Sequence, residues 1–146
     1  MTNEEDEKRI KHMEFVQAII ARMASNSFQI KGWSVTIVTA LFALAGATTK
    51  PIFILIALLP ALSFWGLDAY YLWQERLFRK LYKDLQLSFE TTGNQNEKVK
   101  PFSLSTKDYK SEVRWFKVLR SPTIFIFHGA IIGAIVFFLL SYIAEF

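Results

Sequence analysis

The chain has 146 residues, of which 52% are hydrophobic and 21% charged, and its formal net charge is +4. Its apolar residues gather in three runs with the charges between them, which excludes the mixed pattern of a water-soluble domain of this size. Because it has no cysteine and only two histidines, disulfides, thiolate metal sites and His-rich metal clusters are excluded, and we expect no metal and no cofactor.

Residues 1–32 predict a cytoplasmic N-terminal amphipathic helix, with a break only near Gly32. Its acidic start suits a helix N-terminus, where the macrodipole favours negative charge. Apolar residues then recur at spacings of three and four. We expect this stripe to pack on the chain's own second cytoplasmic helix or on another subunit of an oligomer, and we interpret His12 as a solvated side chain. The stripe consists of Met13, Val16, Ile20 and Met23.

The three apolar runs predict an all-α integral membrane protein with three transmembrane helices. A bilayer core of about 30 Å needs about 20 apolar residues in a helix. Residues 52–73 and 122–146 meet this length, whereas residues 33–48 are short. Because Lys50-Pro51 makes a tight turn, we expect the first two spans to insert together as a hairpin over residues 33–73.

Residues 74–121 predict a cytoplasmic helix, a polar loop over 91–105 and an interfacial helix over 107–119. No Pro or Gly intervenes between Trp73 and Gly93, so the second span should continue as one helix to about residue 89. Such a helix from residue 52 would be about 57 Å long and would project beyond the bilayer. Pro60 should kink it within the membrane.

The basic residues predict the orientation of the spans. Five precede the first span, one lies in the first turn, eleven lie between Trp73 and Ser121, and none follow the third span. The positive-inside rule therefore places the N-terminus and residues 74–121 in the cytoplasm and the C-terminus outside. The same rule accounts for the basic loop, so we do not expect nucleic-acid binding from its charge alone.

Two ionisable residues lie inside predicted spans, where charge is expensive and is a functional candidate by default. Asp68 and His128 lie five and six residues inside the cytoplasmic ends of antiparallel spans two and three. Their similar depth predicts a contact, which is either a structural bond that sets the register of the helices or part of a proton relay. The intramembrane polar groups that we expect to line or gate a pore are Asp68, His128, Thr36 and Thr39.

Small residues predict close helix packing in two spans. Gly129 and Gly133 form a GxxxG pattern in the third span. Its partner is either the first span of the same chain or a symmetry mate. The small-residue face of the first span consists of Thr36, Ala40, Ala43 and Ala47. The chain has no phosphate-binding loop, no dinucleotide fingerprint and no zinc-protease motif, and we expect no enzyme activity.

Residues 13–85 contain segments that resemble an uncharacterised family of small bacterial three-span membrane proteins. These segments are Asn26-Ser27-Phe28, Lys31-Gly32-Trp33, Phe64-Trp65, Asp68-Ala69-Tyr70-Tyr71 and Gln74-Glu75-Arg76-Leu77-Phe78-Arg79. The layout, a two-span hairpin extended by a cytoplasmic helix, is also similar to the SLATT-type membrane effectors of bacterial conflict systems. That resemblance implies a pore-forming effector in the bacterial inner membrane, driven by a nucleotide signal or a partner protein.

Three functions therefore compete. The leading hypothesis is an oligomeric inner-membrane effector of bacterial antiviral defence that contacts membrane lipid and perturbs the membrane. The alternative is a non-conducting scaffold that recruits a cytoplasmic protein through its basic loop. The third is a proton-coupled carrier that uses Asp68 and His128.

Overall fold

The computed structural model describes residues 3–90 and 102–144, and within these residues the fold is all-α and contains no strand. The predicted polar loop falls mostly on residues 91–101, outside the described part. The α-helices are α1 (Asn3–Thr48), α2 (Ile52–Ile56), α3 (Leu58–Glu90), α4 (Trp115–Leu119) and α5 (Pro122–Ala144), and η1 (Lys107–Tyr109) is a 3₁₀ helix.

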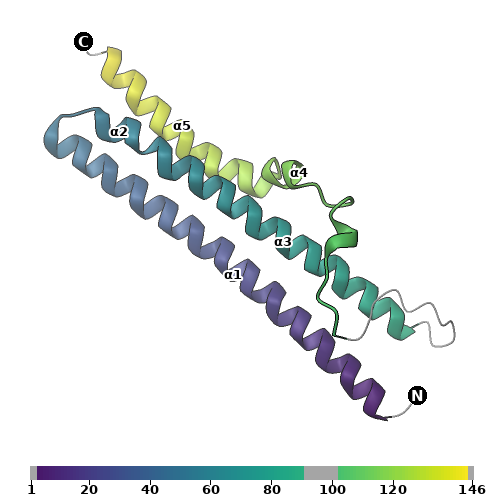
Figure 1. Cartoon of the computed structure of the whole chain (residues 1–146). Helices are drawn as coiled ribbons and strands as arrows, with labels where there is room; N and C mark the ends of the chain where they lie inside the picture. Colours follow the sequence, from purple (N-terminus) through teal and green to yellow (C-terminus); the bar gives the residue numbers. More distant parts are fainter. Residues whose placement is uncertain (1–2, 91–101, 145–146) are drawn as a thin grey trace.

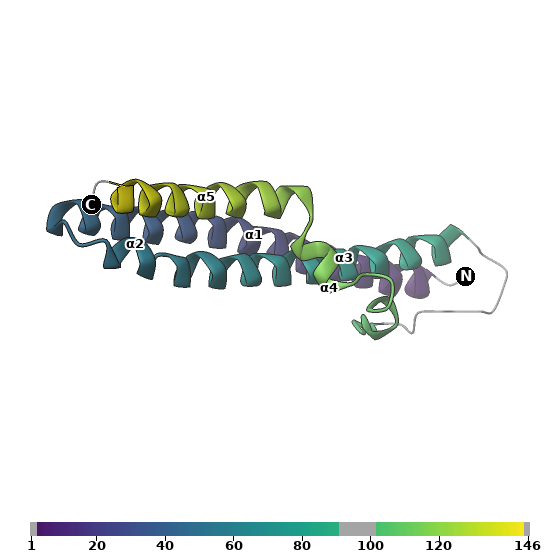
Figure 2. The same cartoon turned by 90° about the horizontal axis from the view of Figure 1, so that it is seen from above.

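The long helices lie side by side in an elongated bundle (Figures 1 and 2). α1 and α3 form an antiparallel pair, and α5 lies along the half of this pair nearest to the α1–α2 turn. We call that half the turn end, and the opposite half, which holds the N-terminus, the polar end. Three helices, which contain α1, α3 and α5, are each long and apolar enough to cross a membrane. The chain thus has the build of a membrane protein.

α1 is continuous over 46 residues, about 69 Å, and runs through Gly32 without a break. The predicted interruption is therefore wrong. Glycine weakens a helix by about 1 kcal/mol relative to alanine, but it keeps the N–H that the helix needs. The polar end and the turn end are consequently joined by a single rigid element.

The second long helix is divided into two near Pro60, where the sequence predicts a kink in one continuous helix. α2 ends at Ile56 and α3 begins at Leu58. Proline lacks the N–H that would bond to the carbonyl four residues earlier, which here belongs to Ile56. Regular bonding resumes at Ala61, whose N–H donates to the Ala57 carbonyl at 3.2 Å. α3 then continues to Glu90, which confirms the long extension beyond the predicted span.

The apolar stripe of α1 packs on the polar half of α3. Val16 is fully buried in one cluster with Leu81 and Leu85. Of the two predicted partners, the chain's own second helix is the one observed, and packing of the stripe on another subunit stays a prediction. Burial against α3 leaves no free apolar surface at Val16 for another subunit. The remaining stripe residues are Met13, Ile20 and Met23, all partly buried.

The segment 107–119 is not the single helix that the sequence predicts. It forms η1 and α4, joined by a turn, because its groups bond to α3 instead of completing a helix. The Tyr109 hydroxyl donates to Asp84 at 2.9 Å, and the Trp73 indole N–H donates to the Val113 carbonyl at 2.6 Å. The bond from Trp73 holds the Val113 carbonyl toward α3. This carbonyl is therefore not part of a helix, and α4 begins only after it, at Trp115.

Candidate functional site

A buried carboxylate joins the three long helices at the middle of the molecule. Asp68 of α3 has no exposed surface. Its Oδ1 accepts hydrogen bonds from Ser27 Oγ at 2.5 Å and Lys31 Nζ at 2.7 Å, both on α1. Its Oδ2 lies 2.6 Å from Lys31 Nζ and 3.0 Å from His128 Nε2 of α5. We call these four residues the Asp68 cluster.

The Asp68 cluster contains a buried ion pair with its hydrogen-bonding groups well satisfied. A carboxylate only accepts hydrogen bonds, and here donors approach both of its oxygens. Lys31 also donates to Ser27 at 2.9 Å, and its side chain is only 21% exposed. The Lys31 ammonium lies 6.0 Å from the Phe127 ring centroid, where the face of the ring attracts a cation. Loss of either charged partner would leave the other poorly solvated.

Aromatic side chains hold His128 in place. The Trp65 ring stacks on the imidazole with centroids 6.2 Å apart and planes 6° apart, and Phe127 meets it edge-on at 5.1 Å. Trp65 is itself fixed by its N–H, which donates to the Leu119 carbonyl at 3.3 Å. Within the described residues His128 Nδ1 is buried without a hydrogen-bond partner. This arrangement suits a neutral ring that donates from Nε2, because a charged ring would bury an unbonded N–H.

The structure confirms the contact between Asp68 and His128 and adds two residues that the sequence interpretation did not assign to it. The similar depth that the sequence predicts for Asp68 and His128 is sufficient to pair these two ionisable side chains. The sequence interpretation gives Ser27 no role in this site and counts Lys31 only among the five basic residues that precede the first span. The signal that could have found them is their spacing, since residues 27 and 31 lie one turn apart on the face of α1 that packs on α3.

The geometry of the Asp68 cluster favours a structural role over proton transfer. Donors from α1 and α5 hold both carboxylate oxygens, so that the cluster sets the register of three helices. Thr36 and Thr39 do not extend it as a polar path. Both are exposed on the far side of α1, and the Thr36 hydroxyl donates to the Gly32 carbonyl of its own helix at 3.0 Å.

The predicted small-residue face of α1 does not pack inside the chain. α1 contacts the rest of the bundle through a face that includes Ser34, Val38 and Ala45. At 100° per residue the small residues fall on the opposite side, which is exposed. This face, which we call the outer face of α1, consists of Thr36, Thr39, Ala40, Ala43 and Ala47.

The GxxxG pattern of α5 is likewise unused within the described chain. No atom lies within 4 Å of the position that a Cβ would take on Gly129 or Gly133. The prediction that these glycines bring α5 close to α1 in the same chain is therefore wrong. α5 instead packs through Ile124, His128 and Ile135, which are all buried. The symmetry mate, the other predicted partner, stays a prediction.

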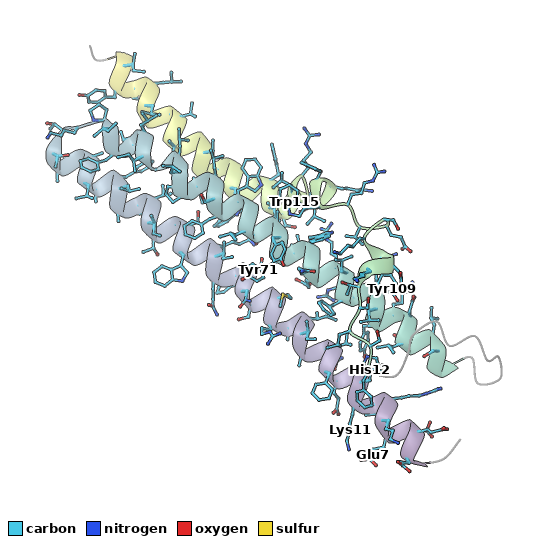
Figure 3. All side chains as sticks on the ribbon, in the orientation of Figure 1. Glu7, Lys11, His12, Tyr71, Tyr109 and Trp115 are labelled. Atoms are coloured by element: carbon cyan, nitrogen blue, oxygen red, sulfur yellow. The ribbon has the colours of Figure 1, made fainter. Side chains whose placement is uncertain are left out.

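His12 is buried and not solvated, contrary to the sequence interpretation. The Phe102 N–H donates to His12 Nδ1 at 3.2 Å, and His12 Nε2 lies 3.1 Å from the Ser103 carbonyl oxygen. The imidazole also stacks on the Phe102 ring at 5.7 Å. A ring that accepts at one nitrogen and donates at the other is neutral. His12 therefore fastens the segment that begins at residue 102 to α1, and Figure 3 shows it at the polar end, beyond Tyr109.

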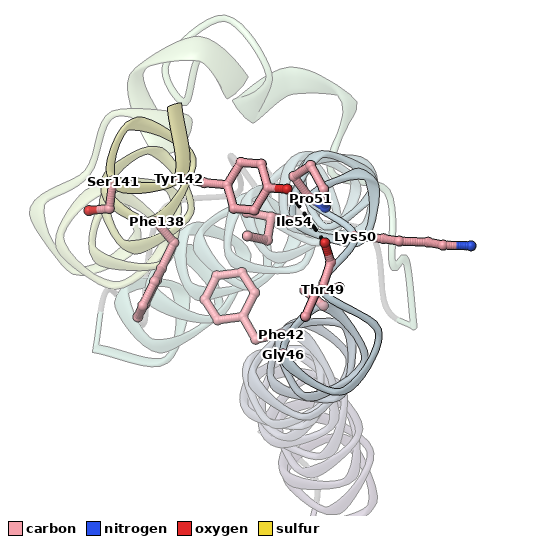
Figure 4. Close-up of a pocket in the computed structure, with 10 residues that line it drawn as sticks. Phe42, Gly46, Thr49, Lys50, Pro51, Ile54, Phe138, Ser141 and Tyr142 are labelled. Carbon is pink, nitrogen blue, oxygen red and sulfur yellow. Dashed lines mark hydrogen bonds between the residues drawn. The ribbon is translucent and has the colours of Figure 1, made fainter. Parts of the chain in front are cut away.

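A cavity of about 530 Å³ opens at the turn end, between the end of α1, α2 and the end of α5. Apolar side chains such as Phe42, Ile54 and Phe138 line most of it (Figure 4). The Tyr142 hydroxyl lies 3.5 Å from the Thr49 carbonyl across the opening. The charged end of Lys50 points away from the cavity. Such a lining suits an apolar chain, consistent with contact between this end and membrane lipid.

In the described residues no group of three or more His, Asp or Glu side chains could hold a metal ion. Comparison of the chain with protein-family models, with curated proteins and with solved structures finds no match.

Proposed function

We propose that the chain is a self-associating effector of the bacterial inner membrane whose copies together perturb or open the bilayer. The observation that carries this proposal is the composition of the outer face of α1. It faces away from the chain's own bundle, yet it presents two hydroxyl groups and three alanines. A face that met only lipid would be expected to resemble α5, whose exposed residues include Ile126, Phe137 and Leu140.

Small residues let helix backbones approach closely, and hydroxyl groups bond across helices in lipid. The outer face of α1 therefore suits contact with another copy of α1 better than contact with acyl chains. Gly129 and Gly133 supply a second surface of the same kind on α5. Two such surfaces on one protomer allow a closed ring, because each copy can use one surface toward each neighbour.

An opening would lie between copies and not within one. The interior of the protomer is occupied by packed side chains and by the Asp68 cluster. Both oxygens of the Asp68 carboxylate already accept hydrogen bonds, so this carboxylate is poorly suited to bind a transported ion or proton. In such a ring the alanines of the outer face of α1 would contact the neighbouring copy, and the hydroxyls of Thr36 and Thr39 would border the central opening. The resemblance to SLATT-type effectors supplies the biological setting, antiviral defence, and the trigger would act at the polar end.

The test measures assembly and leakage together. Purified full-length protein is placed in lipid nanodiscs for mass measurement and in vesicles loaded with a quenched dye. The double variant Ala40→Leu/Ala43→Leu thickens the outer face of α1. Ser63→Leu, at an exposed position of α3 in the predicted second span, adds bulk elsewhere in the membrane and is the control.

We expect several copies per nanodisc and dye release for the wild type and for Ser63→Leu, with both reduced at least about tenfold for the α1 variant, since a clash must be relieved at every copy. A wild type that stays monomeric in nanodiscs, releases no dye from vesicles, and leaves the membrane potential of expressing cells unchanged with or without phage infection would contradict the proposal. If a cytoplasmic protein then co-purified and was lost on deletion of residues 91–119, the scaffold function would replace it.

A further inference from the structure

A groove of about 400 Å³ lies between α3 and α4, apart from the Asp68 cluster and the cavity at the turn end. One wall is the polar half of α3 and the other is α4 with the residues just before it. Six of the nine lining residues are basic and one is acidic. The basic lining residues are Arg76, Arg79, Lys80, Lys83, Arg114 and Lys117.

Within residues 3–90 and 102–144, most of these cations have no ion-pair partner. The acidic lining residue, Glu112, bonds to Lys80 at 2.9 Å, and Arg79 bonds to Glu75 at 2.7 Å. In the described part of the chain the other four basic residues of the groove make no ion pair. The positive-inside rule accounts for the number of basic residues near a membrane, but it does not require cations from two separate segments to line one groove. A bound anion would relieve the mutual repulsion of these cations.

The position of the groove along α3 determines the level, relative to the membrane, at which an anion bound there would lie. Arg76 lies three residues beyond Trp73, the predicted end of the second span, and Lys83 lies ten residues beyond it. These separations correspond to rises of about 4.5 and 15 Å, which cover the headgroup layer and the adjoining water. Phe116 of α4 is 74% exposed beside the groove and suits insertion among lipids.

The side chains that line the groove determine which kind of anion it would bind. Arginine guanidinium groups bond in pairs to the oxygens of a phosphate, and lysine binds it as a point charge. The groove is larger than a single phosphate needs and is of the size of a small-molecule site. We propose that this groove binds a phosphate-bearing anion, either the headgroup of an anionic phospholipid or a soluble polyphosphate. Binding is independent of self-association and of leakage, so either proposal can fail alone.

The experiment titrates full-length protein in neutral detergent and follows the thermal unfolding midpoint, which a ligand of the folded state raises. The probes are dioctanoyl phosphatidylglycerol, dioctanoyl phosphatidylcholine and inorganic pyrophosphate, at matched ionic strength. Arg114→Gln/Lys117→Gln and Arg76→Gln/Lys83→Gln each remove two charges from one wall. Lys8→Gln/Lys11→Gln removes two exposed charges near the N-terminus and is the matched control.

We expect at least one anionic probe to raise the midpoint, and each groove variant to weaken its binding by about tenfold per lost charge. The control should bind within about twofold of the wild type. Stabilisation by phosphatidylglycerol and not by the zwitterionic lipid or by pyrophosphate identifies a lipid headgroup, whereas stabilisation by pyrophosphate identifies a soluble ligand. If a double variant does not fold, Arg114→Gln and the charge-retaining Arg114→Lys separate loss of binding from loss of structure. No stabilisation by any anion, or an equal loss in the control, overturns the proposal.

Discussion

Asp68 illustrates how one residue can set the geometry of a membrane bundle. The free energy of an unpartnered carboxylate inside a bilayer is high, so the helices that carry its donors are held at the depth where the donors reach it. Ser27 and Lys31 come from α1 and His128 from α5. A shift of one turn along any of the three helices would move a donor by about 5.4 Å and break its bond.

The first prediction concerns the charge balance of the Asp68 cluster. Asp68→Asn leaves the Lys31 ammonium without its counter-charge and should lower the unfolding free energy by about 3–5 kcal/mol. Lys31→Met/Asp68→Asn removes both charges, and its amide can accept from His128 Nε2 through its oxygen and donate to Ser27 Oγ through its N–H, so it should recover most of that loss. Thermal or detergent-induced unfolding of the purified proteins measures both. A double variant no more stable than Asp68→Asn would show that the ion pair is not the cause.

The second prediction concerns Tyr109, which lies at the polar end outside the predicted spans. Burial and the Asp84 carboxylate, which accepts its hydroxyl proton, raise the pKa of Tyr109 above its ordinary value of 10.0. The folded chain therefore holds this proton at a pH where the unfolded chain has released it. The stabilisation is complete below about pH 10 and is lost as the pH rises further.

Tyr109→Phe removes the titrating group and should be less stable than the wild type near neutral pH. The gap in melting temperature between the two proteins should then narrow from about pH 10 to pH 12, because only the wild type loses the contribution of Tyr109. Lysine side chains titrate in both proteins and cancel in the comparison. A gap that stays constant over this range would contradict the assigned role of Asp84.

At the scale of elements, the polar halves of α1 and α3 form a helix pair whose interface is buried within one chain. Val16→Ala should cost about 2 kcal/mol, from two lost methyl groups and the small void that remains. Phe15→Ala is the control, since Phe15 is exposed on the same turn. Hydrogen exchange of the amides in the first half of α1 should accelerate only for Val16→Ala. A fall in the number of copies per nanodisc, with exchange unchanged, would instead favour an intermolecular role for this position.

The sequence predicts the elements of this fold better than their ends. Long apolar runs and the absence of helix breakers after Trp73 are strong signals, and the helices that they predict are present. Proline removes one backbone hydrogen bond wherever it lies in a helix, so the place where the second long helix is disturbed could be predicted from Pro60. Gly32 only lowers helix propensity, and the neighbouring turns outweigh it. The division of residues 107–119 depends on bonds to Trp73 and Asp84, which lie 40 and 25 residues from their partners in sequence and leave no local pattern.

The candidate site shows the same limit. Asp68 and His128 could be paired because helix rise converts residue number into depth. Lys31 could not be assigned in the same way, since a lysine near a span is usually explained by orientation alone. The direction of the small-residue faces depends on which side of α1 meets α3, and periodicity gives a face without saying what covers it. His12 was missed because its partners follow a loop of unpatterned sequence.

At the scale of the whole molecule, the orientation in the membrane is the property that decides where each surface acts. The positive-inside rule predicts the polar end in the cytoplasm. The chain has no cysteine, so Lys50→Cys at the turn end and Ser111→Cys near α4 each introduce a unique thiol. A membrane-impermeant maleimide should label Lys50→Cys on intact spheroplasts and Ser111→Cys only after permeabilisation. The reverse pattern would place the basic groove outside the cell.

The unbroken course of α1 has a mechanical consequence. A helix without a hinge cannot absorb a tilt locally, so any tilt of α1 about the Asp68 cluster would move both of its ends. Thr48 lies 17 residues from Lys31 and Asn3 lies 28 residues away on the other side, which gives arms of about 26 and 42 Å. A tilt of about 10° would displace the two ends by about 4 and 7 Å in opposite directions. A displacement of the polar end of α1 would thus produce a smaller displacement of its other end, on the far side of the membrane.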